Sequence, residues 1–279
     1  MNKQFINLNG EFYPEDQPVI HISNRSFRYG DGFFESMRLL KGELMFADLH
    51  VERIQASMQI LKLTSDIHID SYFLRERVGE LVRRNKTGLN ARARLTFFRS
   101  GKGLHSPESN DISYSLELSR LNETAYTINS PGLIIDVFDE MPKPIHILSN
   151  IKTCNSLLPV MAGIFKNQHT LDEVLILNQH GFLCEGMSRN LFVVYKNKIY
   201  TPALSEGCVA GIMRKVIMHL AKENDIDVIE AQINPEILNE ADEVFLTNVI
   251  YGVQWVMGFN NKRYFNRIAH FLANKLAQL

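Results

Sequence analysis

The stretch 147-ILSNIKTCNSLLP-159 holds a single lysine, Lys152, between an apolar run and the start of an expected helix. Lysine is mostly found on the solvated surface of proteins. Here Ile147 and Ile151 precede it and Cys154 follows, so an exposed position would also leave apolar neighbours in water. An amine held in a dry pocket has a lowered pKa and becomes a nucleophile. The stretch therefore suggests that Lys152 points into a pocket.

Composition narrows the class of protein. The chain has 279 residues, enough for one large domain or two modest ones, with 45% hydrophobic and 22% charged residues. The net charge of -1 gives no field that would attract nucleic acid or an anionic membrane. The start "MNKQFINLNGEFYP" lacks the apolar segment of a signal peptide, and no run approaches the roughly 18 apolar residues of a membrane span. We expect a cytoplasmic protein that acts on a small molecule.

The cysteines do not predict a disulfide framework or a metal site. Cys154, Cys184 and Cys208 are scattered, and the sequence contains no CxxC. We expect three reduced thiols in the protein interior, where a small polarizable side chain suits a pocket wall.

The pattern of elements is α+β twice over. We expect a small N-terminal domain over residues 1–121, a linker over 122–131 and a larger, sheet-rich C-terminal domain over 132–279. The first domain should contain a hairpin of residues 3–13 turning at Asn9-Gly10, helices over 48–63 and 70–86, and strands over 91–98 and 113–121, with Asp48 capping the first helix. The second should contain strands over 132–139, 173–178, 190–195 and 243–248, helices over 156–168, 212–223 and 265–278, and hairpin turns at 196–197 and 260–261.

Three further features bear on chemistry. In 207-GCVAGIMR-214, two glycines precede an amphipathic helix, so backbone N–H groups of its first turn can face an anion. Arg53 borders the apolar stripe of its helix, where a guanidinium either covers a domain interface or clamps a phosphate. Glu185 follows a strand at a turn, where it is either solvated or pairs with a protonated ring nitrogen.

Lysine, phosphate cradle, arginine and acidic partner together describe a pyridoxal phosphate site. Each feature also has an ordinary structural explanation, and their spacing alone does not decide between the two.

The whole chain resembles the class IV pyridoxal phosphate enzymes, a group that includes branched-chain aminotransferases, D-amino acid aminotransferases and 4-amino-4-deoxychorismate lyases. Seven segments carry the resemblance, in the family's order and spacing: "SNRSFRYGDGFFESMRL" (23–39), "HVERIQASMQIL" (50–61), "NARARL" (90–95), "IKTCNSLLPV" (151–160), "EGMSRNLFVVYKNKIYTP" (185–202), "GIMRKV" (211–216) and "DEVFLTN" (242–248). The resemblance implies the two-domain fold type IV.

The resemblance also implies a role for individual residues. Lys152 would be the catalytic lysine that forms a Schiff base with pyridoxal 5'-phosphate. Arg53 would bind the cofactor phosphate, Glu185 would face the ring nitrogen, and Ser188 and Asn190 would support the ring edge. The phosphate would lie on the backbone at Gly211, Ile212 and Met213, with help from the Thr247 hydroxyl. Because family members often carry a hydroxyl residue where Met213 stands, one phosphate contact is expected to be missing.

The branch of the family is less clear from the sequence. Branched-chain aminotransferases usually carry Gly-Asn-Tyr soon after the lysine, whereas this chain has Asn155-Ser156. D-amino acid aminotransferases are expected to have a tyrosine at the position of Phe34. We therefore expect a 4-amino-4-deoxychorismate lyase, which eliminates pyruvate to give 4-aminobenzoate, with Phe34, Arg94 and Arg99 binding the substrate. An amino acid aminotransferase and a catalytically idle relative that binds the cofactor are the alternatives.

The resemblance further implies a homodimer with the site in a cleft between the two domains. Phe27, Tyr29, Phe33, Phe34 and Met37 cluster around "YGDG", more apolar surface than one small domain is expected to need for its own core. These residues are expected to contribute to the subunit interface.

Overall fold

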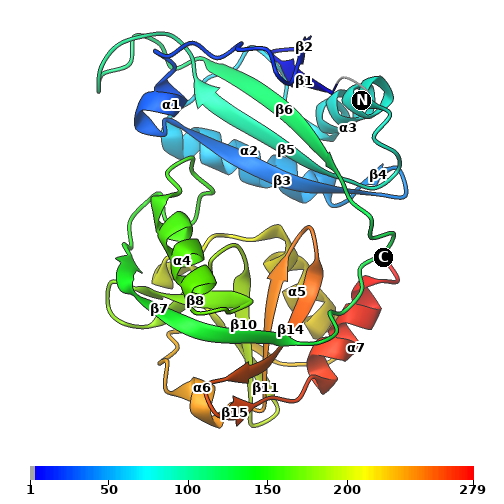
Figure 1. Ribbon diagram of the computed structural model, residues 1–279, viewed down its shortest axis with the longest axis vertical. Coiled ribbons are helices and arrows are strands. Elements are labelled where there is room, and N and C mark those ends of the chain that lie inside the picture. The colour runs from blue at the N-terminus through cyan, green and yellow to red at the C-terminus, as the bar shows by residue number, and fades with distance from the viewer. Residues whose placement is uncertain (1–3) are drawn as a thin grey trace. The chain divides into compact units, whose positions relative to one another are not determined.

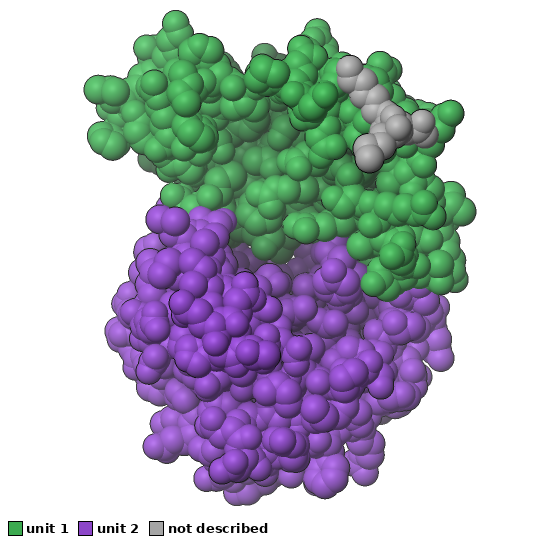
Figure 2. All heavy atoms as spheres, viewed as in Figure 1, with its two compact units in different colours: residues 1–124, 151–155 green, residues 125–150, 156–279 purple. Residues whose placement is uncertain are grey.

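A computed structural model describes residues 4–279, so Lys3 of the expected first hairpin lies outside the described residues. The chain divides into two compact units, which Figure 2 shows in different colours. Unit 1 contains the residues up to Thr124 together with Ile151–Asn155, and unit 2 contains Ala125–Asn150 and Ser156–Leu279. The short segment Ile151–Asn155, expected in the C-terminal domain, thus belongs to unit 1. It contains Lys152.

Unit 1 is an antiparallel sheet with helices packed against it. Its described strands run in the order β2-β1-β6-β5-β3-β4 (Figure 1). The strands are β1 (Phe5–Leu8), β2 (Glu11–Pro14), β3 (Gly32–Leu40), β4 (Glu43–Leu44), β5 (Ala91–Arg99) and β6 (Ile112–Arg120), and the helices are α1 (Arg25–Tyr29), α2 (Ala47–Leu61) and α3 (Ser71–Asn85). The β1–β2 hairpin turns at Asn9 and Gly10, both with positive φ, as the sequence predicted.

The two long helices of unit 1 begin in different ways. Asp70 caps α3 by accepting a hydrogen bond from the Phe73 N–H at 2.7 Å. Asp48 does not cap α2, which begins one residue before it, after the left-handed Phe46. Instead the Asp48 carboxylate accepts a hydrogen bond from the Ser71 hydroxyl at the start of α3. The acidic residue therefore links the beginnings of the two helices.

Strand β3 lies inside the sheet of unit 1 between β5 and β4, and nearly every residue in it is buried. Phe33 and Met37 are fully buried within unit 1, and Phe34 is almost so. Of the apolar cluster expected at a subunit interface, Phe27 is the member that is largely exposed, at 69%. Most of the cluster thus serves the core of its own unit.

Unit 2 is built on a larger mixed sheet, whose described strands run in the order β12-β11-β10-β13-β14-β7-β8-β9, with β15 added to β14 (Figure 1). The strands are β7 (Leu133–Lys143), β8 (Glu173–Asn178), β9 (Leu183–Gly186), β10 (Asn190–Tyr195), β11 (Lys198–Pro202), β12 (Val228–Ala231), β13 (Glu243–Asn248), β14 (Gly252–Phe259) and β15 (Lys262–Arg263), and the helices are α4 (Leu157–Gln168), α5 (Ile212–Glu223), α6 (Ile237–Glu240) and α7 (Arg267–Leu276), with a single 3₁₀ turn at Leu204–Glu206. Both units thus combine helices with sheet, as the α+β pattern predicted.

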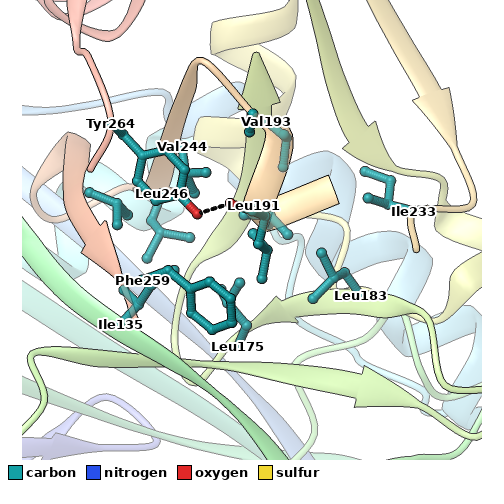
Figure 3. Packing of buried hydrophobic residues seen from close by; sticks show 13 residues of the cluster. Ile135, Leu175, Leu183, Leu191, Val193, Ile233, Val244, Leu246, Phe259 and Tyr264 are labelled. Atoms are coloured by element: carbon teal, nitrogen blue, oxygen red, sulfur yellow. Dashed lines mark hydrogen bonds between the residues drawn. The ribbon is translucent and has the colours of Figure 1, made fainter. Parts of the chain in front are cut away.

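The core of unit 2 gathers aliphatic residues of several strands around Phe259 and Tyr264 (Figure 3). The Tyr264 hydroxyl is buried too, and it donates a hydrogen bond of 2.6 Å to the Leu238 carbonyl. Burial without that partner would cost free energy, so the bond fixes the end of α6 against the core.

Strand β7 continues four residues beyond its expected end and includes Pro142. Its pairing with β8 shifts between Phe138 and Lys143, and proline is tolerated at such an irregularity because no regular ladder bond is lost there. The shift matters because it places Lys143 at the end of the strand. No helix formed by residues 4–279 is long and apolar enough to cross a membrane.

Candidate active site

The segment around Lys152 is attached to the beginning of β3. The Phe34 N–H donates to the Lys152 carbonyl at 2.9 Å, the Cys154 N–H donates to the Gly32 carbonyl at 2.9 Å, and Phe33 forms a β-bridge with Thr153. These bonds extend the sheet of unit 1 by a short edge strand. They hold the backbone of Lys152 and leave its half-buried side chain over the Phe34 ring, with Nζ 4.5 Å from the ring centroid.

Arg94 approaches the same aromatic ring. Its guanidinium carbon lies 3.7 Å from the Phe34 centroid, in the geometry of a cation–π contact. Burial lowers the pKa of Arg94, although arginine remains charged near neutral pH. Because Arg94 pairs with Ser36 in the β3–β5 ladder, it lies on the Phe34 face of the sheet. Two cationic side chains and an aromatic ring therefore lie together in unit 1, an arrangement suited to a carboxylate.

Arg99 is placed differently. Its Nε donates to the Asp31 carboxylate at 3.1 Å, its Nη1 to Asn110 at 2.5 Å and its Nη2 to the Leu61 carbonyl at 2.8 Å. The side chain is buried, and every nitrogen of its fork has a partner within unit 1. Of the two arginines expected to bind substrate, we therefore carry Arg94 forward and interpret Arg99 as part of the framework.

Arg53 lies on α2 against β3. Its Nε and Nη2 donate to the two carboxylate oxygens of Glu35 at 2.8 and 2.6 Å. The second of these oxygens also pairs with His50 Nδ1 at 2.5 Å. Burial alone would raise the pKa of Glu35, but attraction to Arg53 and His50 and their hydrogen bonds lower it to about 2. The carboxylate is therefore ionised at neutral pH.

Glu185 in unit 2 belongs to another ion pair. Its Oε1 accepts from Lys143 Nζ at 2.5 Å, and its Oε2 accepts from the Val209 N–H at 2.8 Å. Burial would lower the pKa of Lys143, yet the Glu185 charge and hydrogen bond raise it. Lys143 is therefore a fixed cation.

The buried thiols beside this pair stay protonated. Burial raises the pKa of Cys208 to about 12 and also raises that of Cys184, so neither thiol adds charge. The interior position expected for Cys184 and Cys208 is confirmed, whereas Cys154 in unit 1 is only partly buried.

Asn190 connects Glu185 to the start of α5. Its Nδ2 donates to the Val209 carbonyl at 2.8 Å, so Asn190 and Glu185 hold opposite sides of the same residue. Its Oδ1 lies so close to Gly211 that a Cβ there would overlap it. Glycine is thus required where the loop enters the helix.

The beginning of α5 has the properties of an anion cradle. Gly211 is its N-cap, and no side chain within the described part of the chain caps the first turn formed by Ile212 and Met213. Thr247, paired with Asn190 across β10 and β13, has a buried hydroxyl with no hydrogen-bond partner among the described residues. An uncapped helix start and an orphaned hydroxyl together fit a phosphate.

The expected site residues fall into two groups. Lys152, Arg53, Phe34, Arg94 and Arg99 belong to unit 1. Glu185, Ser188, Asn190, Gly211, Ile212, Met213 and Thr247 belong to unit 2, where Ser188 is exposed between β9 and β10. Sequence reasoning gave no role to Glu35 and Lys143, the two residues that hold Arg53 and Glu185. Their only signal is that each is a charged residue in a largely apolar strand.

The chain belongs to the class IV amino-transferase family, whose family model matches residues 32–257. It is therefore an enzyme of that family, and the fold is the one expected.

Similar proteins carry two different names. The chain is 29% identical over 251 residues to a putative branched-chain-amino-acid aminotransferase of Methanocaldococcus jannaschii, covering 87% of this chain and 83% of the relative. It is 26% identical over 257 residues to the aminodeoxychorismate lyase of Bacillus subtilis, covering 88% and 83%. Among solved structures, the branched-chain aminotransferase of the archaeon Thermoproteus uzoniensis with norvaline superimposes with a TM-score of 0.87 at 22% identity, covering 98% of this chain and 93% of that one.

A further solved structure bears on the cofactor. It is a branched-chain amino acid aminotransferase from the source abbreviated T.th., and it contains pyridoxamine 5'-phosphate. The TM-score is 0.85 at 23% identity, covering 99% of this chain and 93% of that one. The fold of this chain is thus one that holds the aminated form of pyridoxal 5'-phosphate in a similar protein.

Proposed function

We propose that the chain is a pyridoxal 5'-phosphate enzyme that acts, through Lys152, on a small carboxylic acid bearing an amino group. The observation that carries the proposal is the grouping of the Lys152 amine and the Arg94 guanidinium around the Phe34 ring. It supplies a nucleophile beside a group that attracts a carboxylate. Membership of the class IV family and the cofactor form bound by the T.th. enzyme support the choice of cofactor.

The residues of the chain divide the work of binding the cofactor. Gly211, Ile212, Met213 and Thr247 would hold its phosphate together with Arg53. Glu185, kept ionised beside Lys143, would accept a hydrogen bond from the ring nitrogen, while Asn190 fixes the backbone between the two groups. When bound, the cofactor supplies an electron sink for bonds at the amine-bearing carbon of the substrate. Lys152 would then move a proton at that carbon.

For the reaction, we favour elimination of pyruvate from 4-amino-4-deoxychorismate to give 4-aminobenzoate. The lysine segment has Asn155-Ser156 where a branched-chain aminotransferase is expected to have Gly-Asn-Tyr, and Phe34 contributes a ring without a hydroxyl. The resemblance to the lyase of Bacillus subtilis supports this choice. Amino acid transamination is the second candidate, supported by the relative from Methanocaldococcus jannaschii. We also propose that the protein works in the cytoplasm as a homodimer.

Two measurements test the proposal. Borohydride should reduce the cofactor onto the protein, and peptide mapping should find the adduct on Lys152 rather than on Lys143, whose raised pKa keeps it protonated. Incubation with aminodeoxychorismate should release pyruvate and 4-aminobenzoate in equal amounts. A panel of L- and D-amino acids with an oxo-acid acceptor measures the alternative. An adduct on another lysine would contradict the assignment of Lys152, and amino transfer without elimination would contradict the lyase.

A further inference from the structure

Glu35, His50 and Arg53 form a buried polar cluster in unit 1. Glu35 is 1% exposed, His50 is fully buried and Arg53 is 12% exposed. One carboxylate accepts three hydrogen bonds of 2.5 to 2.8 Å from the two other side chains. A carboxylate buried this deeply is tolerated only because it is paired and hydrogen-bonded.

The position of each member is fixed by its element. Glu35 lies opposite Leu95 in the middle of the β3–β5 ladder. His50 and Arg53 are three residues apart on α2 and therefore share one face of the helix. One turn later, the Ser57 hydroxyl donates to the Arg53 carbonyl at 2.7 Å. The cluster thus connects a rigid strand to a helix at a defined point along both.

The protons of the cluster can be assigned from its hydrogen bonds. Glu35 is ionised, so His50 Nδ1 must donate to it. His50 Nε2 is buried and has no hydrogen-bond partner among residues 4–279. A doubly protonated ring would leave an unsatisfied N–H there, whereas a neutral ring leaves only a lone pair. The cluster therefore combines one anion, one guanidinium cation and a neutral imidazole.

The geometry has a consequence for Arg53. The guanidinium is planar and rigid, so bonds from Nε and Nη2 to Glu35 also fix the direction of the edge formed by Nη1 and Nη2. We propose that Glu35 is a positioning residue that directs this second edge of Arg53 toward a phosphate dianion, with His50 holding the carboxylate. The inference rests on the proposed role of Arg53 in binding the cofactor phosphate. It assigns to Glu35 the reason that a flexible arginine binds in a prepared orientation.

A purely structural role for Glu35 would have a different signature. Loss of a framework contact would weaken the binding of every ligand of the site to a similar extent. Loss of the orientation of Arg53 would weaken the binding of ligands that carry a phosphate and spare those that lack one. Pyridoxal 5'-phosphate and pyridoxal differ only in that group, so the ratio of their dissociation constants separates the two roles.

The experiment measures both dissociation constants by absorbance on the full-length apoprotein, with inorganic phosphate as a competitor. Glu35→Gln should weaken binding of pyridoxal 5'-phosphate by about tenfold or more, the effect of one lost charge-assisted hydrogen bond, and that of pyridoxal by less than about twofold. Competition by inorganic phosphate should weaken to the same extent as that of the phosphorylated ligand. The matched control is Glu43→Gln, which neutralises an exposed carboxylate in the same unit and should leave both constants unchanged.

Further variants decide how the effect arises. Arg53→Ala should show the same selective loss, and the double variant Glu35→Gln/Arg53→Ala should lose no more than Arg53→Ala alone. Glu35→Asp, which keeps the charge, should recover part of the selectivity, and His50→Asn should show a smaller loss in the same direction. These two variants also provide the measurement if Glu35→Gln does not fold. Equal weakening of both ligands by Glu35→Gln, or additive losses in the double variant, would overturn the inference. If the unaltered protein binds pyridoxal as tightly as pyridoxal 5'-phosphate, the proposed function fails instead.

Discussion

Glu185 and Lys143 show how a single charge pair shapes the expected chemistry. Glu185→Gln should leave the cofactor bound but reduce turnover, because a neutral amide does not keep the ring nitrogen protonated. The loss of one preorganised charge corresponds to about 3 kcal/mol of barrier, or roughly a hundredfold in kcat. Stopped-flow or steady-state rates at saturating substrate, with the dissociation constant of the cofactor measured in parallel, provide the test.

The same variant also removes the partner of a largely buried cation, so its stability must be controlled. Lys143 loses its ion pair in Glu185→Gln, and the melting temperature of that variant should fall. Adding Lys143→Met removes the unpaired charge and should restore stability without restoring turnover. If turnover returned together with stability, Glu185 would have a structural role only.

Arg94 and Arg99 are two residues of one strand with different expected roles. Arg94→Ala should raise KM by about tenfold or more with kcat little changed, because it removes one charge-assisted contact to the substrate carboxylate. Arg99→Ala should leave KM unchanged and lower the melting temperature, because Asp31, Asn110 and the Leu61 carbonyl lose their donor. Kinetics and thermal unfolding of both variants test this. A raised KM for Arg99→Ala with normal stability would return that residue to the substrate site.

The functional residues and their partners differ in how well the sequence reveals them. Lys152, Arg53 and Glu185 lie in motifs that the resemblance identifies one by one. The bonds from Glu35 to Arg53 and from Lys143 to Glu185 span 18 and 42 positions, and no local pattern connects such residues. Asp48 shows a further difficulty, because its sequence position suited a helix cap while its actual partner comes from the next helix.

Among the elements, the start of α5 gives the sharpest test of the phosphate cradle. Gly211→Ala would drive a methyl group into Asn190 and displace the loop that joins it to Val209. We expect a lower melting temperature and about tenfold weaker retention of pyridoxal 5'-phosphate, since the loss of one charge-assisted contact has that size.

The control is another glycine-to-alanine change, in a helix interior. At Gly79 in α3, an added Cβ would meet only the flexible end of Arg83, so Gly79→Ala should stabilise the protein by roughly 0.5–1 kcal/mol. Cofactor retention should be unchanged in this variant. Unaltered retention in Gly211→Ala as well would contradict the cradle.

The elements differ in how much of them the sequence predicts. Helices α3 and α5 have amphipathic periods with clear ends, and α5 was predicted to the residue. Strand β3 was not predicted as a strand, because almost all of it is buried, including Glu35 and Arg38, so the sequence shows no alternation of apolar and polar residues. Strand β7 passes through Pro142 because its pairing shifts there, and that irregularity depends on β8, not on local propensity.

At the scale of the whole molecule, we expect a homodimer with twice the 32.0 kDa mass of the chain. Large apolar side chains remain exposed in each unit: Ile22 and Phe27 in unit 1, and Leu157, Val160 and Ile164 along one face of α4 in unit 2. Such patches commonly mark interaction sites. Light scattering on the purified protein across a range of concentrations tests the expectation. A fully active species with the mass of one chain would contradict it.

The assignment of Ile151–Asn155 to unit 1 has a consequence for how the protein is made. A ribosome that has completed residue 124 has not yet synthesised the strand that pairs with Gly32 and Phe34. Until residue 155 emerges, that edge of the nascent sheet keeps unsatisfied N–H groups, and such edges pair readily with other chains. A fragment ending at Thr124 should therefore aggregate on release, whereas one ending at Asn155 carries its own edge strand, and the lysine with it.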